Sequence, residues 1–227
     1  ESLGCTYTDC SSLNISGPVH ILNYPNETSS ISFQNNQITS FSATEFDAMP
    51  SLEYIILKNN TLKALSPEQF AKNTRLKNIQ LSDNNLETLS PEQFAKNTRL
   101  ESIDLTNNRL ETLSPGLFLH NAGLYALYLG AQAYNCNVFP PYPSSDPKYC
   151  FQACHGLHNL DRNQFAGNPF LFTLDLSDNA LSYLPAGLFR KNKKLGTLLS
   201  SYSFRNRSSF GLFVRLYKIC GGSSLQN

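Results

Sequence analysis

Five closely spaced cysteine and histidine residues have the clearest capacity for chemistry in this chain. They are Cys136, Cys150, Cys154, His155 and His158. Thiolate and imidazole groups at such spacings can hold a zinc ion, whereas cysteines in an oxidising compartment pair as disulfides. The chain has six cysteines, an even number. We therefore predict disulfides here and no metal site.

The other three cysteines lie near the two ends of the chain, as Cys5, Cys10 and Cys220. We expect Cys5 to pair with Cys10. Cys136 can then pair with either Cys150 or Cys154. The cysteine left over pairs with Cys220 in the arrangement that we favour, and otherwise Cys220 is free or bonds to another chain.

No catalytic grouping accompanies these residues. The chain lacks the Gly-x-Ser-x-Gly, phosphate-loop and His-Glu-x-x-His motifs. His20 and His120 stand alone. Cys154 and His155 are adjacent in sequence, which does not by itself place a base beside a nucleophile. We predict that the protein is not an enzyme and uses no cofactor.

The composition excludes several classes of protein. Charged residues make up 15% and the formal net charge is +1, so the chain lacks the basic excess typical of a nucleic-acid binder. No apolar run approaches the ~18 residues that a membrane span requires. The chain has 34 Leu and 24 Asn. Because leucine favours burial and asparagine does not, some pattern must separate them.

A repeat of 24 residues provides that pattern. The string LSPEQFAKNTRL occurs at residues 65–76 and again, letter for letter, at residues 89–100. Copies of L-x-x-L-x-L-x-x-N-x-L begin at residues 28, 52, 76, 100, 124, 171 and 195, some of them weak. A Phe lies six residues before most of these copies, at Phe46, Phe70, Phe94, Phe118, Phe165 and Phe189. One such unit cannot bury its own apolar face, so the units must stack around a shared core.

These columns of Leu, Asn and Phe resemble the extracellular leucine-rich repeat family in its 24-residue form. The resemblance covers about residues 28–219. It implies an α/β solenoid, a curved horseshoe with a parallel concave sheet and short helical or 3-10 turns on the convex side. Within the family, the chain resembles Toll-like receptor ectodomains, lamprey lymphocyte receptors and secreted insect immune proteins.

Each part of the repeat has its own local signals. The alternating L-x-L segment predicts a short strand with its leucines inward. The Asn after it is expected to bond backbone groups of the turn. Ser66 with Gln69, and Ser90 with Gln93, match the capping box that begins a helix. Left-handed asparagines are expected to end that one-turn helix, at Asn73, Asn97, Asn121, Asn168 and Asn192.

The repeat is interrupted between Leu127 and Leu174, whose numbers differ by 47, or two units less one residue. We interpret this as one degenerate repeat with its strand at residues 150–152 and His155 at the Asn position. Residues 135–156 hold four prolines, which predicts a protruding loop. A bond from this loop to Cys220 would cross about three repeats, on the order of 14 Å at ~4.8 Å per strand. Because a disulfide needs Cα atoms within about 7 Å, the loop must reach along the stack.

The chain divides into three predicted regions. Residues 1–27 lack the repeat and are expected to cap the open end of the stack. Residues 28–203 hold about seven to eight repeats, one of them degenerate, and residues 204–227 form a C-terminal cap and tail. The chain begins with Glu1 and shows no signal peptide, which we interpret as a processed mature chain.

The residues that alternate with the buried leucines should form the binding surface on the concave sheet. We predict ligand contacts from Tyr54, Ile56, Lys58, Gln80, Asp104, Tyr128 and Asp175. The tyrosines are the expected anchors, because Tyr provides contact area and a hydroxyl at low entropic cost. The resemblance implies a protein ligand, no nucleic acid is expected, and a dimer is compatible with the sequence.

The family resemblance also implies a class of function. It predicts a secreted or ectodomain recognition protein, in innate immunity or in pathogen or ligand sensing. The alternatives are a structural or adhesive matrix protein and an enzyme inhibitor. An extracellular location agrees with the cysteines and with four glycosylation sequons, at Asn14, Asn26, Asn59 and Asn206. A glycan on Asn59, beside Lys58, would direct a ligand toward the central repeats or the convex side.

Overall fold

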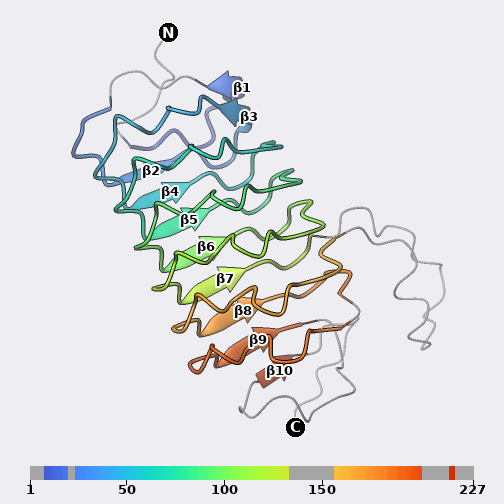
Figure 1. Cartoon of the computed structure of the whole chain (residues 1–227). Helices are drawn as coiled ribbons and strands as arrows, with labels where there is room; N and C mark the ends of the chain where they lie inside the picture. Colours follow the sequence, from blue (N-terminus) through green and yellow to red (C-terminus); the bar gives the residue numbers. More distant parts are fainter. Residues whose placement is uncertain (1–7, 20–23, 133–155, 182, 201–214, 218–227) are drawn as a thin grey trace, which may run out of the picture.

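The computed structural model describes residues 8–19, 24–132, 156–181, 183–200 and 215–217. These residues form a curved stack in which each turn contributes one short strand (Figure 1). In chain order the strands are β1 (Ser16–Val19), β2 (Ser30–Ser32), β3 (Gln37–Phe41), β4 (Tyr54–Ile56), β5 (Asn78–Gln80), β6 (Ser102–Asp104), β7 (Ala126–Tyr128), β8 (Thr173–Asp175), β9 (Thr197–Leu199) and β10 (Arg215–Tyr217).

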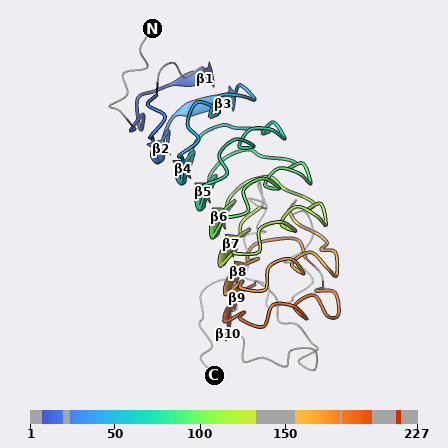
Figure 2. The same ribbon diagram turned by 60° about the vertical axis from the view of Figure 1, so that its left-hand side comes forward.

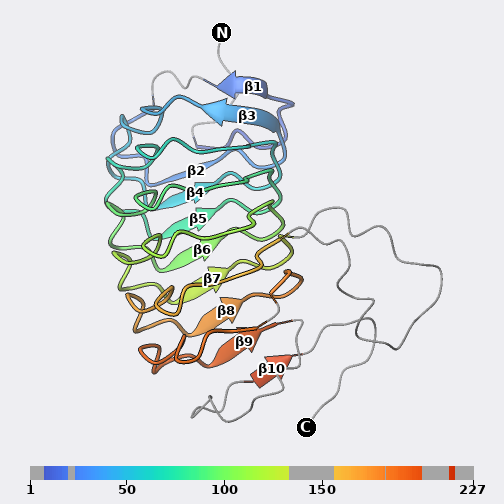
Figure 3. The ribbon, with the colours of Figure 1, turned by 45° about the vertical axis from the view of Figure 1, so that its right-hand side comes forward.

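Eight of the described strands form one parallel sheet on the inner side of the curve (Figure 2). Their order is β2-β4-β5-β6-β7-β8-β9-β10, so neighbours in the sheet follow one another along the chain. β1 and β3 pair in a separate parallel sheet at the N-terminal end (Figure 3). The predicted solenoid with a parallel concave sheet is confirmed.

Alternation along the three-residue strands decides which side chains enter the core. The central residue of every strand of the large sheet up to β9 is fully buried: Ile31, Ile55, Ile79, Ile103, Leu127, Leu174 and Leu198. Behind them runs the Phe column, in which the rings of Phe94 and Phe118 are nearly parallel, with centroids 6.3 Å apart. Burying each such side chain stabilises the fold by about 1.5–3 kcal/mol relative to exposure. The core is therefore continuous along the stack.

The Asn after each strand bonds backbone groups of two successive repeats, as predicted. Asn84 Nδ2 donates to the carbonyls of Leu57 at 3.0 Å and Leu81 at 3.1 Å. Its Oδ1 accepts from the Leu62 N–H at 3.0 Å. Equivalent bonds are made by Asn60, Asn108, Gln132 and Asn179. We call this set, with Asn84, the concave ladder.

The convex half of each repeat consists of tight turns closed by bonds between residues three apart. The Gln69 N–H donates to the Ser66 carbonyl at 3.0 Å, and the described residues contain no helix. The predicted capping box is wrong in its second half. Gln69 Nε2 donates to the Ser42 carbonyl of the preceding repeat at 2.7 Å instead of returning to Ser66. Gln93 repeats this contact with Ser66 at 2.8 Å, so these glutamines join repeats.

The five asparagines after the Phe column were predicted to be left-handed, and this prediction is wrong. None of the five, all among the described residues, has a positive φ. They are buried and donate to carbonyls of the preceding repeat, as Asn97 Nδ2 does to Phe70 at 2.9 Å and Asn73 at 3.0 Å. A convex ladder thus ties the turns together. Left-handed residues occur instead just before the concave ladder: Asn35, Asn59, Asp83, Asn107, Ala131 and Asp178.

The strands on either side of the interruption are neighbours in the sheet. β7 pairs directly with β8, although the two strands begin 47 residues apart, so the sheet has no further strand between them, and the predicted strand at residues 150–152 lies outside the described residues. Asn179 Oδ1 accepts from the Leu157 N–H at 3.2 Å, and its Nδ2 donates to the Leu129 carbonyl at 2.8 Å. These are the bonds that each residue of the concave ladder makes to the repeat before it. The spacing of 47 equals one 24-residue unit plus 23 added residues, which follow Gln132 in the sequence.

Removing residues 133–155 is expected to leave the fold intact. The deletion joins Gln132 to Gly156 and restores the spacing found in Asn108-Arg109-Leu110. Closing or removing such a loop changes stability by about 1 kcal/mol, so the melting temperature should move by no more than about 4 °C. Circular dichroism should compare the deletion with its parent, both carrying Cys220→Ser. Loss of cooperative unfolding would contradict the placement of the insertion.

The two ends depart from the repeat. Cys10 is buried beneath the first turns and takes part in a disulfide, and the Tyr24 hydroxyl donates to its sulfur at 2.9 Å. The partner lies outside the described residues, so the pairing with Cys5 stays a prediction. β10 begins at Arg215, six residues earlier than the 24-residue spacing from Thr197 predicts. The predicted region boundaries at 27/28 and 203/204 are not tested by the structure.

Candidate functional site

Side chains on the concave face form two rows that cross the strands. The register sets one row side by side as Ile56, Gln80, Asp104, Tyr128, Asp175 and Leu199. The other row is Tyr54, Asn78, Ser102, Ala126, Thr173 and Thr197. Adjacent strands lie about 4.8 Å apart. A partner lying across the sheet would therefore meet a new side chain from each repeat at that interval.

The register brings five of the seven predicted contact residues into one row, from Ile56 to Asp175. Tyr54 begins the other row and is 45% exposed. Lys58 lies two residues beyond Ile56, with its ammonium 3.6 Å from the Asp83 carboxylate. Because both charges of that pair face solvent, the ion pair contributes little and Lys58 remains available to a ligand. The role of the seven residues in binding stays a prediction.

The two acidic side chains of the first row are held by the turns that follow them. Asp104 Oδ1 accepts from the Thr106 N–H at 2.9 Å. Asp175 Oδ1 accepts from the Ser177 N–H at 2.8 Å and from the Ser177 hydroxyl at 2.6 Å. A Cβ atom on Gly130 would lie 2.9 Å from both Asp175 Oδ2 and Ser177 Oγ, so a larger residue there would displace these two side chains. These carboxylates are thus fixed in place before any ligand arrives.

The two most similar repeats differ only on this face and at its edges. Residues 65–88 and 89–112 agree at every position except six. The differing pairs are Lys77/Glu101, Asn78/Ser102, Gln80/Asp104, Ser82/Thr106, Asp83/Asn107 and Asn85/Arg109. All six lie in a strand or in the residues flanking it, whereas the convex turns are identical. The scaffold is therefore repeated while the chemistry of the concave side changes.

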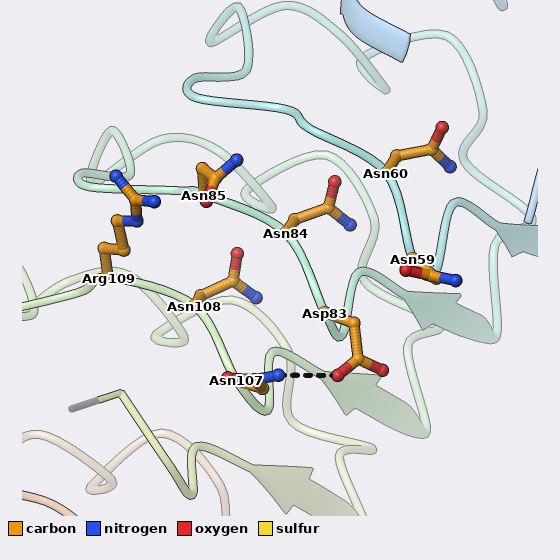
Figure 4. A pocket seen from close by; sticks show the side chains of 8 residues that line it. All are labelled: Asn59, Asn60, Asp83, Asn84, Asn85, Asn107, Asn108 and Arg109. Carbon is orange, nitrogen blue, oxygen red and sulfur yellow. Dashed lines mark hydrogen bonds between the residues drawn. The ribbon is translucent and has the colours of Figure 1, made fainter. Parts of the chain in front are cut away.

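A polar pocket lies at the edge where β4, β5 and β6 end (Figure 4). It has a volume of about 280 Å³ and is lined by Asn59, Asn60, Asp83, Asn84, Asn85, Asn107, Asn108 and Arg109. Asn107 Nδ2 donates to Asp83 Oδ1 at 2.7 Å. Asn59, Asp83 and Asn107 have φ values of 53°, 57° and 54°, which Asn and Asp tolerate better than most residues.

Sequence reasoning missed Asn85, Asn107 and Arg109 as candidate contact residues. The available signal was the pair of substitutions Asp83/Asn107 and Asn85/Arg109 between the two nearly identical repeats. The ladder asparagines of the pocket are the same in both repeats, because they serve the backbone. The rim of the pocket is therefore part of the same varied surface as the two concave rows.

The predicted glycosylation sites can be placed in three cases. Asn14, Asn26 and Asn59 are all exposed, whereas Asn206 lies outside the described residues. Asn59 Nδ2 donates to Asn35 Oδ1 at 3.0 Å on the surface. Exposure is what a modified Asn requires, and the modification itself stays a prediction.

At the opposite edge, the residue before each strand forms a column. Its members are Glu53, Lys77, Glu101, Tyr125, Phe172 and Gly196. The Lys77 ammonium donates to Glu53 Oε2 at 2.7 Å, which lowers the pKa of the Glu53 carboxyl and raises the pKa of the Lys77 ammonium. Their stabilisation is present between the two pKa values, and is lost as acid protonates Glu53 or alkali deprotonates Lys77. Being solvent-exposed, the pair contributes little.

The part of the chain that the structure describes has no group of three His, Cys, Asp or Glu side chains placed to hold a metal ion. It likewise has no helix long and apolar enough to cross a bilayer. The predicted disulfide cysteines Cys5, Cys136, Cys150, Cys154 and Cys220 lie outside the described residues.

Comparisons with known proteins agree with the repeat. Residues 27–85 and 74–131 match the family described as leucine rich repeat. The crystal structure of TLR13 with ssRNA13 is similar, with a TM-score of 0.64 and 25% identity over 78% of this chain. A chain of the Drosophila Toll–Spätzle complex has a TM-score of 0.57 and 22% identity over 82% of this chain. At 22% identity that second likeness shows the fold alone.

Both solved chains are much longer than this one. The present chain covers 22% of the matched TLR13 chain and 26% of the matched chain of the Toll–Spätzle complex. No curated protein sequence matches. What the longer proteins do with their remaining repeats therefore has no direct counterpart in these 227 residues.

Proposed function

We propose that this chain, which carries leucine-rich repeats and resembles Toll-like receptor ectodomains, recognises a protein partner through its concave face. The observation that carries the proposal is the comparison of residues 65–88 with residues 89–112. Their differences fall only on the strands and strand edges. A purely structural solenoid has no need to vary that side while keeping its convex turns identical.

The chemistry of the two rows favours a protein over a nucleic acid. Neither row contains a Lys or an Arg, and the first row holds Asp104 and Asp175. Nucleic-acid binding depends on cations that neutralise phosphates. Tyr128 lies between the two aspartates in the row, so it is the anchor that we assign to a partner's polar and apolar contacts.

The proposed setting is extracellular, in innate immunity or ligand sensing. Support comes from the likeness to TLR13, while the Toll–Spätzle complex, described as a hub in development and innate immunity, shares the fold. Exposed sequons at Asn14, Asn26 and Asn59 and the disulfide-bonded Cys10 agree with that setting. The protein acts in this proposal as a recognition module without catalytic activity.

The test begins with a partner captured from the extracellular fluid of the source organism. Tyr54→Ala with Tyr128→Ala should then weaken affinity at least tenfold, since losing one interface anchor costs about 2 kcal/mol. Biolayer interferometry should include Tyr183→Ala as the control, because Tyr183 is 59% exposed but belongs to neither row. Unchanged affinity of the double variant would remove the concave face as the site.

The same captured partner separates the rival functions. A matrix protein would self-associate or bind collagen. An inhibitor would form a stable one-to-one complex with an enzyme and block its activity. Binding of a microbial or signalling protein with neither property supports the recognition function.

A further inference from the structure

Four exposed apolar side chains belong to two successive repeats, and two of them directly precede β7 and β8. They are Leu119, Tyr125, Phe170 and Phe172, which are 55%, 51%, 58% and 39% exposed, and we call them the aromatic flank. The rings of Tyr125 and Phe172 stack with centroids 5.2 Å apart and an interplanar angle of 3°. Contiguous exposed apolar surface is uncommon in soluble proteins and marks sites of interaction.

The fold does not require apolar side chains at these positions. In the preceding repeats, the position of Phe170 is held by Arg75 and Arg99, and that of Tyr125 and Phe172 by Lys77 and Glu101. Those repeats form the same turns and strands. The aromatic flank is therefore a local replacement of charge by apolar surface, on repeats whose folding does not depend on it.

Two glycines hold the flank in a defined geometry. A Cβ atom on Gly196 would overlap the ring of Phe172, and one on Gly167 would lie 2.5 Å from the Leu119 carbonyl oxygen. Phe172 therefore packs over the bare backbone at Gly196 while it stacks on Tyr125. A surface whose rings are fixed in advance loses less entropy when a partner binds.

A cluster of cations adjoins the flank in the next repeat. Arg190, Lys191, Lys193 and Lys194 are all exposed, and no acidic residue occurs from residue 183 to residue 200. Lys194 holds the position that Phe170 holds one repeat earlier. We call these four cations the basic turn. The cationic side chains thus follow the apolar ones in the next repeat, on the same side of the stack.

We propose that the aromatic flank and the basic turn form a second docking surface, which binds an acidic protein segment carrying an apolar side chain between carboxylates. The apolar side chain would contact Phe170 and the edges of the stacked rings, and the carboxylates would pair with Lys193 and Lys194. The shared faces of Tyr125 and Phe172 are taken up by one another, whereas base stacking on single-stranded nucleic acid requires free aromatic faces. This surface lies outside the two concave rows and does not depend on the proposed function.

The test uses a fluorescein-labelled peptide in which Phe and Leu are flanked on both sides by Glu. Phe170→Ser, and separately Lys193→Glu with Lys194→Glu, should each weaken binding by fluorescence anisotropy at least about tenfold. The charge reversal should also abolish the salt dependence of binding. The matched controls Lys72→Glu with Lys96→Glu, and Tyr183→Ser, alter exposed residues elsewhere and should bind as the parent does.

Several outcomes would overturn the proposal. They are no saturable binding of the peptide, equal binding of a peptide with Gln in place of Glu, and tighter binding of heparin or oligothymidylate that the same variants abolish. The last of these would make the surface a general polyanion site. Tyr128→Ala should leave peptide affinity unchanged, so failure of this surface and failure of the concave site are separate results.

Discussion

Asn84→Ala is expected to lower the free energy of unfolding by about 3–5 kcal/mol. The side chain of Asn84 bonds the Leu57 carbonyl, the Leu81 carbonyl and the Leu62 N–H. All of these groups are shielded from water within the stack, so alanine leaves them unsatisfied, at about 1–3 kcal/mol each. The midpoint of urea unfolding should fall accordingly, without loss of the folded state at low temperature.

The neighbouring residue provides the matched control for this change. Asn85 is partly exposed and lines the polar pocket, and its backbone N–H, which donates to Leu62, is kept in any substitution. Asn85→Ala should therefore change stability by no more than about 0.5 kcal/mol. Equal effects of the two changes would mean that the concave ladder is not what holds the turns.

Phe94→Ala is expected to destabilise the protein by about 3–5 kcal/mol. Phe94 is fully buried in the middle of the Phe column and its ring lies 6.3 Å from that of Phe118. Alanine removes the transfer free energy of the ring and leaves a cavity that the rigid turns on either side cannot close. Differential scanning calorimetry should record the loss as a lower melting temperature.

The last described member of the same column is the comparison. Phe189 stacks on Phe165 at 6.1 Å but is only partly buried. Phe189→Ala should cost about 1–2 kcal/mol, because less of its apolar surface leaves water on folding. A cost equal to that of Phe94→Ala would show that position along the stack has no influence on packing.

The periodic part of this fold was predictable because every repeat must bury the same positions and bond the same backbone groups. Apolar residues such as Ile79, Ile103 and Leu127 recur at fixed spacings, and this recurrence predicts that they are buried. Asn84 likewise recurs in neighbouring repeats, which predicts the concave ladder. The role of Asn97 was not predictable from one repeat. Its partners, Phe70 and Asn73, belong to the preceding turn. The sequence of one repeat was therefore equally compatible with a local left-handed cap.

The spacing alone could not decide how the interruption is built, for an arithmetical reason. An added length of 23 residues differs from a full repeat by one, so spacing alone cannot separate an insertion from a degenerate unit. The deciding signal was that Leu157 and Leu160 match Leu110 and Leu113 when 47 is subtracted, and both are buried.

The candidate site was only partly visible in the sequence. Alternation predicted the row from Ile56 to Asp175, because side chains of a short strand have two faces only. The pocket rim at Arg109 and the stack of Tyr125 on Phe172 were missed. Those residues lie at the strand edges, where orientation depends on how one repeat sits upon the next.

The concave ladder has a direction, and that direction has a consequence for biosynthesis. Asn84 serves Leu57 and Leu62 of the repeat before it, and Asn108 serves Leu81 and Leu86 in turn. A ribosome supplies residues in the same order. The backbone groups of each turn of the nascent chain can therefore bond only to water until the ladder residue of the next repeat has been translated.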